Sequence, residues 1–314
     1  MNPQSSDWTG LSLRVPASTS NLGPGFDFLG LALSLELEIR VLGLEGEMPR
    51  FVECTGTAAG WPRGADNLVL RAFELAARGL GLQASPGLVL AAHSEIPVAR
   101  GLGSSGAAIV AGLLLAERAS GRRASEEQLL TWGLQLEGHP DNSSAALLGG
   151  CTLSVPVGGG RLRVVRAELA PELCFALAWS EDKLATREAR AVLPVQVPFA
   201  DAVENPRRLA LLLEGLRRAD AELLALGIED RLHVQHRLPL IRGGREALGA
   251  ARAAGAWAAT ISGSGSSLIA LAPRARAQAA ADAMATELRR ATGGATARVV
   301  EAVQGAPRFA YSRA

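Results

Sequence analysis

The chain has 314 residues, 48% of them hydrophobic, which is enough for one large core or two smaller ones, and its length predicts two domains. The formal net charge is +1 and aromatic residues make up only 4%, so neither nucleic acid nor an anionic membrane surface is an expected partner. Neither a charge-free apolar run of about 18 residues nor a secretory leader is apparent, which predicts a cytoplasmic protein without a membrane span. Cys54, Cys151 and Cys174 lack metal-binding spacing and are expected in the core.

The first half of the chain alternates segments typical of strands with segments typical of helices. The segment 33–42 alternates apolar and charged residues, which predicts a strand with one buried face. Ser125 and Gln128 form a capping-box pattern, which predicts a helix that runs to about Glu137. The other expected strands are 11–16, 87–93 and 149–157, and the other expected helices are 67–79 and 104–120.

The second half repeats this mixture of elements. Strands are expected at 173–179, 258–262 and 268–272, and helices at 185–191, 206–226, 241–254 and 275–292. The segment VGGGR at 157–161 is predicted to be a turn or a seam between domains. The sequence therefore predicts an α+β protein with one domain at 1–160 and a second at 161–314.

Three glycines before the helix 104–120 suggest a nucleotide site. Gly101, Gly103 and Gly106 have the G-x-G-x-x-G spacing of a dinucleotide fingerprint. However, EIPVAR separates them from the preceding strand, and the next acid, Glu117, falls within the following helix. A Walker P-loop is excluded because it needs a lysine after its second glycine, and Lys183 is the only lysine of the chain.

A phosphate loop without lysine is the third interpretation of these glycines. Glycine lets the backbone approach an anion closely, and the free N–H groups at the start of a helix favour negative charge. Ser104 and Ser105 occupy that start, and a serine hydroxyl can complete the oxygen shell of Mg²⁺. An ordinary glycine turn capped by Ser104 remains an alternative.

Three segments resemble, in order and spacing, the motifs of the GHMP kinase superfamily: RVPASTSNLGPGFDFLG at 14–30, IPVARGLGSSGAA at 96–108 and TISGSGSSLIAL at 260–271. Within it the chain looks most like the homoserine kinases, on SNLGPGFDFLG, LEGHPDNSSAALLGG, ATREARAVLP and DRLHVQHR. The resemblance implies the two-domain GHMP kinase fold. Its N-terminal domain is similar to part of ribosomal protein S5 and binds ATP, and its C-terminal domain is ferredoxin-like.

The activity implied by the resemblance is Mg²⁺-dependent transfer of the ATP γ-phosphoryl group to the side-chain hydroxyl of L-homoserine, a step toward threonine. The resemblance also implies a homodimer. Two other functions stay open: another kinase of the superfamily, acting on mevalonate, an isoprenoid precursor or a sugar, and a nucleotide-binding regulator without turnover. A dehydrogenase is a more distant third.

Ser105 and Glu137 match the positions of Mg²⁺ ligands in this family. A carboxylate suits the role because Mg²⁺ usually takes one or two carboxylates together with phosphate oxygens. Considered alone, Glu137 is a glutamate at the C-terminal end of a helix, where an anion is disfavoured. Asn67 matches an asparagine on the adenine side and fits a helix N-cap equally well. The residues expected to hold ATP are Asn67, Pro97, Val98, Ala99, Arg100, Gly101, Leu102, Gly103, Ser104, Ser105, Gly106 and Ala107.

The amino-acid substrate offers a carboxylate, which the planar fork of arginine can bind bidentately. Arg190 and Arg237 match the family positions that hold this carboxylate, and Thr186 lies near them in the motif. Asp27 is expected to bind the ammonium group, while turn chemistry in GPGFD also explains an aspartate there. The expected substrate-binding residues are Asn21, Asp27, His139, Asp141, Asn142, Thr186, Arg190, Arg237 and Gly263.

The segment HPDN at 139–142 contains the candidate general base. A positioned base contributes roughly 10²–10⁴-fold to a rate, and Asp141 is the obvious candidate. Related kinases place their proposed base one position away, where this chain has Asn142, so a structural or substrate-binding role for Asp141 stays open. The expected catalytic residues are Asp141, Glu137 and Ser105.

Overall fold

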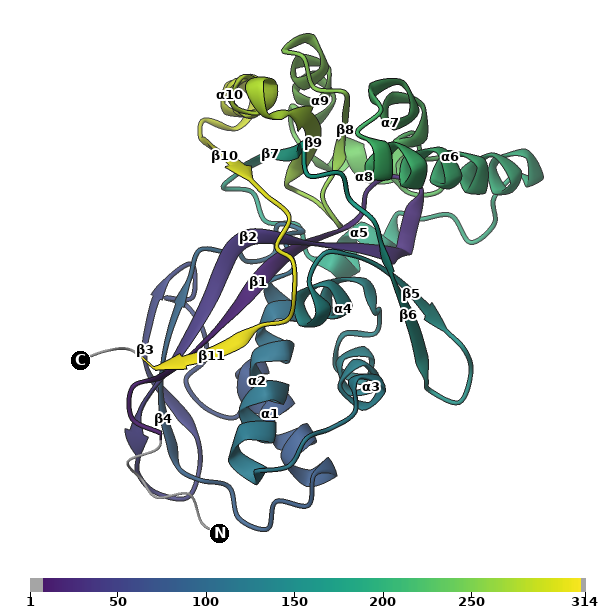
Figure 1. Cartoon of the computed structure of the whole chain (residues 1–314). Coiled ribbons are helices and arrows are strands. Elements are labelled where there is room, and N and C mark those ends of the chain that lie inside the picture. The colour runs from purple at the N-terminus through teal and green to yellow at the C-terminus, as the bar shows by residue number, and fades with distance from the viewer. Residues whose placement is uncertain (1–7, 312–314) are drawn as a thin grey trace.

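The computed structural model describes residues 8–311, which form two sheets with helices packed against them (Figure 1). The first sheet has 7 strands in the order β11-β1-β2-β4-β3, and β5 and β6 extend it from β2. The second sheet has 4 strands in the order β10-β7-β9-β8. Within residues 8–311, no helix has the length and apolar character needed to cross a membrane.

The two longest strands, β1 and β2, form the centre of the first sheet. They pair antiparallel from Ser12–Arg40 to Asn21–Gly25, so the first motif, at 14–30, contains most of β1, the turn that joins the strands and the start of β2. The strands of this sheet are β1 (Leu11–Asn21), β2 (Gly25–Leu44), β3 (Arg50–Gly56), β4 (Leu88–Ser94), β5 (Cys151–Pro156), β6 (Leu162–Ala167) and β11 (Arg308–Tyr311).

Helix α2 is the central helix of the first domain. Its residues are apolar or small around most of its circumference, and such a helix is stable only when it is buried. Gly103 and Gly121 adopt left-handed conformations at its two ends, so it begins and ends where predicted. The helices of this domain are α1 (Leu68–Gly79), α2 (Ser104–Ser120), α3 (Glu126–Glu137) and α4 (Asp141–Leu148).

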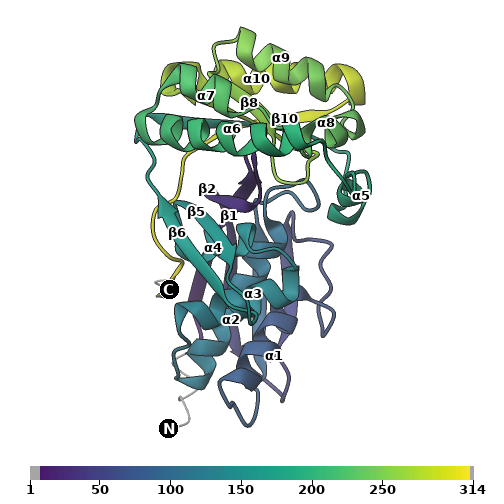
Figure 2. The same ribbon diagram turned by 90° about the vertical axis from the view of Figure 1, so that its right-hand side faces the viewer.

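The second sheet is covered on both faces. Every residue of β7 is buried, and successive side chains of a strand point to opposite faces of the sheet. Cys174 and Ala176 face the core under α9 and α10, whereas Phe175 and Leu177 belong to the larger core that includes α6. Figure 2 shows α9 and α10 on the side away from the first domain. The elements are β7 (Leu173–Ser180), β8 (Ala258–Ile261), β9 (Leu268–Pro273), β10 (Ala295–Val300), α5 (Thr186–Ala191), α6 (Phe199–Arg218), α7 (Ala221–Gly227), α8 (Val234–Arg237), α9 (Gly244–Ala253) and α10 (Arg274–Thr292).

Most predicted elements are confirmed, but the long helix predicted at 206–226 is wrong at both ends. Helix α6 starts at Phe199, keeps Pro206 inside it and ends before Ala219, whose left-handed conformation separates α6 from α7. The segment 157–161 is a hairpin turn between β5 and β6, closed by the hydrogen bond from Val157 N to Arg161 O. Cys151 and Cys174 are buried as predicted, and Cys54 is half-buried.

Sheet membership bears on the predicted division of the chain at residue 160. Strand β6 pairs with β5, and the C-terminal strand β11 pairs with β1, so both belong to the first sheet. The connection from β10 to β11 therefore returns the chain to its N-terminal half (Figure 1). The domain limits 1–160 and 161–314 stay a prediction.

Candidate active site

A cavity of about 480 Å³ lies where the first and third motifs meet the glycine loop. Its volume is in the range of small-molecule sites, and polar groups from both domains line it. The lining residues are Ser20, Asn21, Asp27, Leu68, Arg71, Pro97, Ala99, Arg100, Gly101, Leu102, Gly103, Ser104, Ser105, Ile109, Leu136, Glu137, His139, Asp141, Asn142, Thr186, Arg190, Arg237, Gly263 and Ser264.

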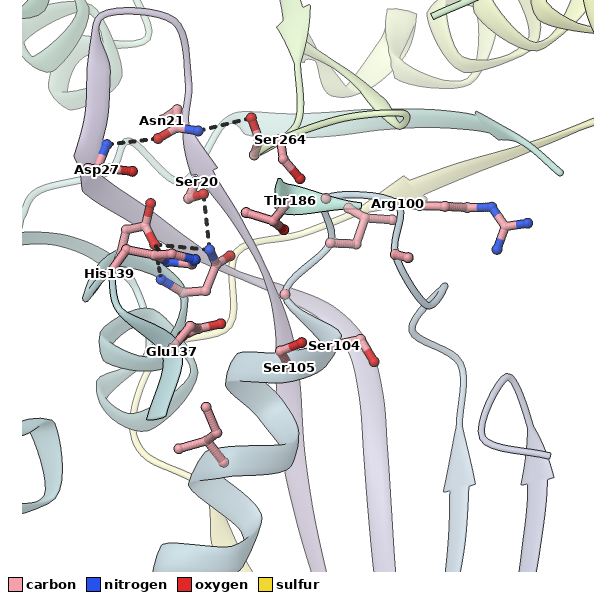
Figure 3. Close-up of a pocket in the computed structure, with 18 of the residues that line it drawn as sticks. Ser20, Asn21, Asp27, Arg100, Ser104, Ser105, Glu137, His139, Thr186 and Ser264 are labelled. Atoms are coloured by element: carbon pink, nitrogen blue, oxygen red, sulfur yellow. Dashed lines mark hydrogen bonds and ion pairs between the residues drawn. The ribbon is translucent and has the colours of Figure 1, made fainter. Parts of the chain in front are cut away.

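The start of helix α2 forms one wall of this cavity. Gly103 precedes the helix with φ of +70°, and no side chain caps the helix start. Ser104 and Ser105 lie in the first turn and face the cavity (Figure 3). Free N–H groups and the helix dipole make this wall suited to a phosphate group.

The third motif packs directly on the glycine loop. A Cβ atom on Gly101 would lie 2.1 Å from the carbonyl oxygen of Ser262, so only glycine allows this backbone contact. The hydroxyl of Ser262 donates to the carbonyl of Gly101 at 2.7 Å. Gly263 N donates to the carbonyl of Ser20 at 3.1 Å, which ties the third motif to the first. Contacts between the three motifs thus fix the shape of the loop.

Glu137 ends helix α3 with its carboxylate in the cavity wall. Its Oε2 atom is buried and has no hydrogen-bond partner among the described residues. Burial raises the pKa of Glu137 to about 7, since the opposing charge of His139 offsets only part of the cost. Figure 3 shows the side chain directed toward Ser105 at the start of α2. An unpaired carboxylate oxygen beside a serine hydroxyl fits a Mg²⁺ ion that also binds phosphate.

His139, Asp141 and Asn142 form a hydrogen-bonded group beside Glu137. Asp141 Oδ1 accepts from His139 Nδ1 at 2.8 Å, from Asn142 N at 2.7 Å and from Asn142 Nδ2 at 3.0 Å. Burial opposes the protonation of His139, but the bond to Asp141 and the charges of Glu137 and Asp141 prevail and raise its pKa to about 9. The imidazole is therefore charged at neutral pH and offsets negative charge on the neighbouring carboxyl groups.

Asp27 and Arg190 meet at the opposite side of the cavity. Arg190 Nη1 donates to Asp27 Oδ2 at 2.8 Å, and Nη2 donates to Oδ1 at 2.6 Å. Asn21 Oδ1 accepts from the backbone N–H of Asp27 at 2.9 Å, and Asn21 Nδ2 donates to the carbonyl of Gly263. The aspartate and the arginine expected to bind opposite ends of one substrate thus bind each other here.

Arg237 lies beneath this pair and is only 1% exposed. Its Nε donates to the carbonyl of Ala189 at 3.0 Å, and its Nη1 donates to that of Gly263 at 3.3 Å. Burial and the nearby charge of Arg190 lower its pKa to about 10, so it remains charged at neutral pH. The guanidinium groups of Arg237 and Arg190 lie 5.0 and 5.5 Å from the ring centre of Phe26.

Four of the residues predicted to bind ATP do not line the cavity. Asn67 is 1% exposed and uses both ends of its amide within the chain, accepting from Val69 N and donating to the carbonyl of Pro62. The structure therefore gives Asn67 the helix-capping role, and its contact with adenine stays a prediction. The other three are Val98, Gly106 and Ala107.

Arg100 lines the cavity with its backbone, while its side chain leaves the loop (Figure 3). Its Nε donates to the carbonyl of Ser180 at 2.8 Å, and its Nη2 donates to the carbonyl of Glu181 at 2.7 Å. Both acceptors lie at the end of β7 in the second sheet. The guanidinium of Arg100 is therefore a link between the domains.

Six cavity residues escaped the sequence analysis. Arg71 and Leu68 are three positions apart on α1, so fixing the start of that helix would have placed both on one face. Ile109 lies four positions after Ser105 on α2, so it lies on the same face of that helix. The remaining three, Ser20, Leu136 and Ser264, each adjoin a residue that the motifs identified.

Comparison with known proteins assigns the chain to a family. The family described as GHMP kinases N terminal domain matches residues 67–150, and GHMP kinases C terminal matches residues 212–290. A homoserine kinase of Prochlorococcus marinus (strain MIT 9303) is 43% identical over 272 residues, which are 86% of either chain. The chain belongs to the homoserine kinase family of GHMP kinases.

Other members of the homoserine kinase family are similarly close. One from Synechococcus sp. (strain RCC307) is 42% identical over 280 residues, which are 88% of either chain. The crystal structure of homoserine kinase from Cytophaga hutchinsonii ATCC 33406 has a TM-score of 0.84 and 27% identity, over 96% of this chain and 98% of that one. Methanococcus jannaschii mevalonate kinase, with a TM-score of 0.66 and 14% identity, shares the fold. The predicted family and two-domain GHMP kinase fold are confirmed.

Proposed function

We propose that the protein transfers the γ-phosphoryl group of ATP to the side-chain hydroxyl of L-homoserine, giving O-phospho-L-homoserine and ADP. The observation that carries this function is the convergence of two half-sites in one cavity. The start of α2 offers phosphate-binding N–H groups, and the Asp27–Arg190 pair offers one charge for each end of an amino acid. O-Phosphorylation of homoserine is a step toward threonine.

The nucleotide would bind with its phosphates against Ser104 and Ser105. In the reaction, the hydroxyl oxygen of homoserine forms a bond to the γ-phosphorus while the bond to the β–γ bridging oxygen breaks, and ADP leaves. Because the transition state is loose, holding the two reactants in line contributes more than covalent chemistry by the protein. The glycine loop, fixed by the third motif, supplies that positioning.

Glu137 and Ser105 are the residues proposed to hold Mg²⁺. When bound, the ion would neutralise charge on the β- and γ-phosphate oxygens. The unpartnered Oε2 of Glu137 supports this assignment. Within residues 8–311, no cluster of three or more His, Cys, Asp and Glu side chains could hold a metal. The ion would therefore take its other ligands from phosphate and water, as Mg²⁺ commonly does.

Asp141 is proposed to position the acceptor and not to remove its proton. Its Oδ1 already accepts three hydrogen bonds, so that oxygen is occupied by its neighbours and is not free to accept from the substrate hydroxyl. The group formed with His139 and Asn142 instead holds the start of α4 against β1, through bonds of 3.0 and 3.1 Å between Asn142 and the hydroxyls of Ser18 and Ser20. The proton of the hydroxyl would then pass to phosphate or solvent.

The proposal also includes a homodimer in the cytoplasm. Its support is the resemblance to a family whose members are commonly dimeric. Light scattering of the purified protein would give the mass of the assembly, for comparison with the mass of one chain.

The test of the function is ADP release from Mg-ATP with different acceptors. We expect strong release with L-homoserine and little with L-serine, L-threonine, mevalonate or galactose, and none after Mg²⁺ is chelated. Release only with mevalonate or a sugar would keep the superfamily and overturn the amino-acid site. ATP binding without ADP release on any acceptor would point to a regulator instead.

A further inference from the structure

We propose that the Asp27–Arg190 pair makes the acceptor site selective for zwitterions, because a substrate reaches either charge only by separating the two residues. This inference rests on the proposed function and adds a reason for its specificity. The pair is a bidentate ion pair on the cavity wall and not a contact elsewhere on the surface. An amino acid would replace both halves of the pair, its carboxylate on Arg190 and its ammonium on Asp27.

The pair uses up groups that a substrate needs. Both terminal nitrogens of Arg190 donate to Asp27, and both carboxylate oxygens of Asp27 accept from them, at 2.8 and 2.6 Å. A substrate carboxylate cannot form two parallel hydrogen bonds with the Nη1–Nη2 edge of Arg190 while these remain. A substrate ammonium likewise competes with two charged donors for Asp27.

Arg237 cannot replace Arg190 in full as the partner of a substrate carboxylate. Two of its nitrogens are already committed, Nε to the carbonyl of Ala189, and Nη1 to the carbonyl of Gly263 and to His233 Nδ1. Arg237 therefore has Nη2 left for a ligand and cannot offer the whole fork. Bidentate capture of a carboxylate by the two terminal nitrogens of an arginine in this cavity requires Arg190, and hence release of Asp27.

The surroundings of Asp27 and Arg190 hold both residues in place when the two side chains separate. Asp27 has φ of +56°, a left-handed conformation that Asp and Asn tolerate, and Asn21 accepts from its N–H. The guanidinium of Arg190 lies 5.5 Å from the centre of the Phe26 ring. Side chains so held can exchange partners over a small distance without moving the loop.

Selectivity follows from counting the charges that each ligand satisfies. A zwitterion replaces one ion pair by two charged contacts. An alcohol with only a carboxylate leaves Asp27 unpaired, and an alcohol with only an amine leaves Arg190 unpaired. The pair is about one-third exposed, 37% for Arg190 and 35% for Asp27, so its separation carries a modest penalty.

The decisive experiment measures binding of 4-hydroxybutanoate, which is homoserine without its ammonium group, to the full chain with a non-hydrolysable ATP analogue and Mg²⁺. In the Asp27→Asn variant we expect the dissociation constant of 4-hydroxybutanoate to fall by about two- to tenfold, because Arg190 is freed. L-Homoserine should bind at least about tenfold more weakly, because its ammonium loses a charged partner. Asparagine suits the left-handed backbone, so the variant should fold.

Two controls separate release of Arg190 from the simple loss of a negative charge. In the Arg190→Met background, Asp27→Asn should no longer improve binding of 4-hydroxybutanoate. Asp182→Asn removes a similar bidentate pair, with Arg242, outside the cavity and should change neither affinity. Circular dichroism would show that each variant keeps its fold.

The outcomes distinguish this inference from the proposed function. If wild-type protein phosphorylates homoserine but Asp27→Asn binds 4-hydroxybutanoate no better, the selectivity role is overturned and the kinase stands. A gain that persists in the Arg190→Met background also overturns it, since bulk charge then explains the effect. If wild-type protein releases no ADP with homoserine, the proposed function is overturned, and the selectivity role that rests on it is overturned as well.

Discussion

Glu137 is a single residue whose burial in the cavity wall opposes the stability of the folded protein. Burial raises its pKa from the ordinary 4.5 to about 7. Between these two values the folded protein binds a proton that the unfolded chain has lost, so stability falls as pH rises through this window. Above pH 7 the folded state carries a poorly solvated charge that a cation would neutralise.

The Glu137→Gln variant should therefore be more stable than wild type at pH 8 and much closer to wild type at pH 5, near the lower end of this window. The expected gain at pH 8, without Mg²⁺ or nucleotide, is on the order of 1–3 kcal/mol, while kinase activity is lost. Urea denaturation at the two pH values measures the difference. The control is Glu214→Gln, because Glu214 is exposed and Arg217 lowers its pKa to about 2. A gain of the same size at both pH values would contradict the linkage.

At the scale of single elements, the two ends of helix α2 provide a matched comparison. Gly103 and Gly121 both adopt left-handed conformations, with φ of +70° and +63°. A Cβ atom on Gly103 would lie 2.0 Å from Ser18 Oγ, whereas one on Gly121 would meet nothing within 4 Å. The strain of the backbone is shared, but only Gly103 is packed against the site.

Gly121→Ala should cost about 1 kcal/mol of stability and leave the KM for ATP unchanged. Gly103→Ala should cost about 2–4 kcal/mol and raise the KM for ATP at least tenfold, because the start of α2 must move away from Ser18. Thermal unfolding and steady-state kinetics of the two variants measure these effects. Equal KM values for both would argue against phosphate binding at this end of α2.

Sequence patterns predicted most of the buried elements and missed exposed strands at the edges of the sheets. Helix α2 was predicted to the residue because its apolar run lies between two glycines. The missed strands β3, β6, β10 and β11 each lie at an edge of a sheet and are largely exposed, so they lack the apolar alternation that indicates a strand. The predicted start of α6 at Pro206 failed because that proline lies inside the helix.

The candidate site was predicted better than the edge strands because its residues belong to recognisable motifs. All nine residues expected to bind the substrate line one cavity, although they come from segments far apart in the chain. The pairing of Asp27 with Arg190 and the direction of the Arg100 side chain depend on how the two domains pack. Such contacts leave no periodic pattern in the sequence, so they could not be predicted.

At the scale of the whole molecule, Arg100 joins the nucleotide loop to the second sheet. It is 8% exposed and donates to two carbonyl groups at the end of β7, to the carbonyl of Val98 within the loop, and to the carboxylate of Glu181, the last at 3.0 Å. Arg242 also binds a carboxylate, that of Asp182, but its side chain is 61% exposed. Burial should make the first arginine far more important than the second.

Arg100→Met should lower the free energy of unfolding by about 2–4 kcal/mol, because two carbonyl groups lose a charged donor. Arg242→Met should lower it by less than about 1 kcal/mol. Urea denaturation of both variants gives the comparison. Similar decreases in the free energy of unfolding for the two variants would mean that the link between the glycine loop and β7 adds little to the stability of the domain interface.

The return of β11 to the first sheet has a consequence for synthesis of the protein. The hydroxyl of Ser12 donates to the carbonyl of Ala310 at 3.3 Å, across 298 positions of sequence. On the ribosome, β1 therefore emerges long before the strand that will cover its edge. During translation that edge is open to other chains, and strand edges are where mispairing starts. Slow translation or deletion of the C-terminal strand β11 should thus favour aggregation of the nascent chain through β1.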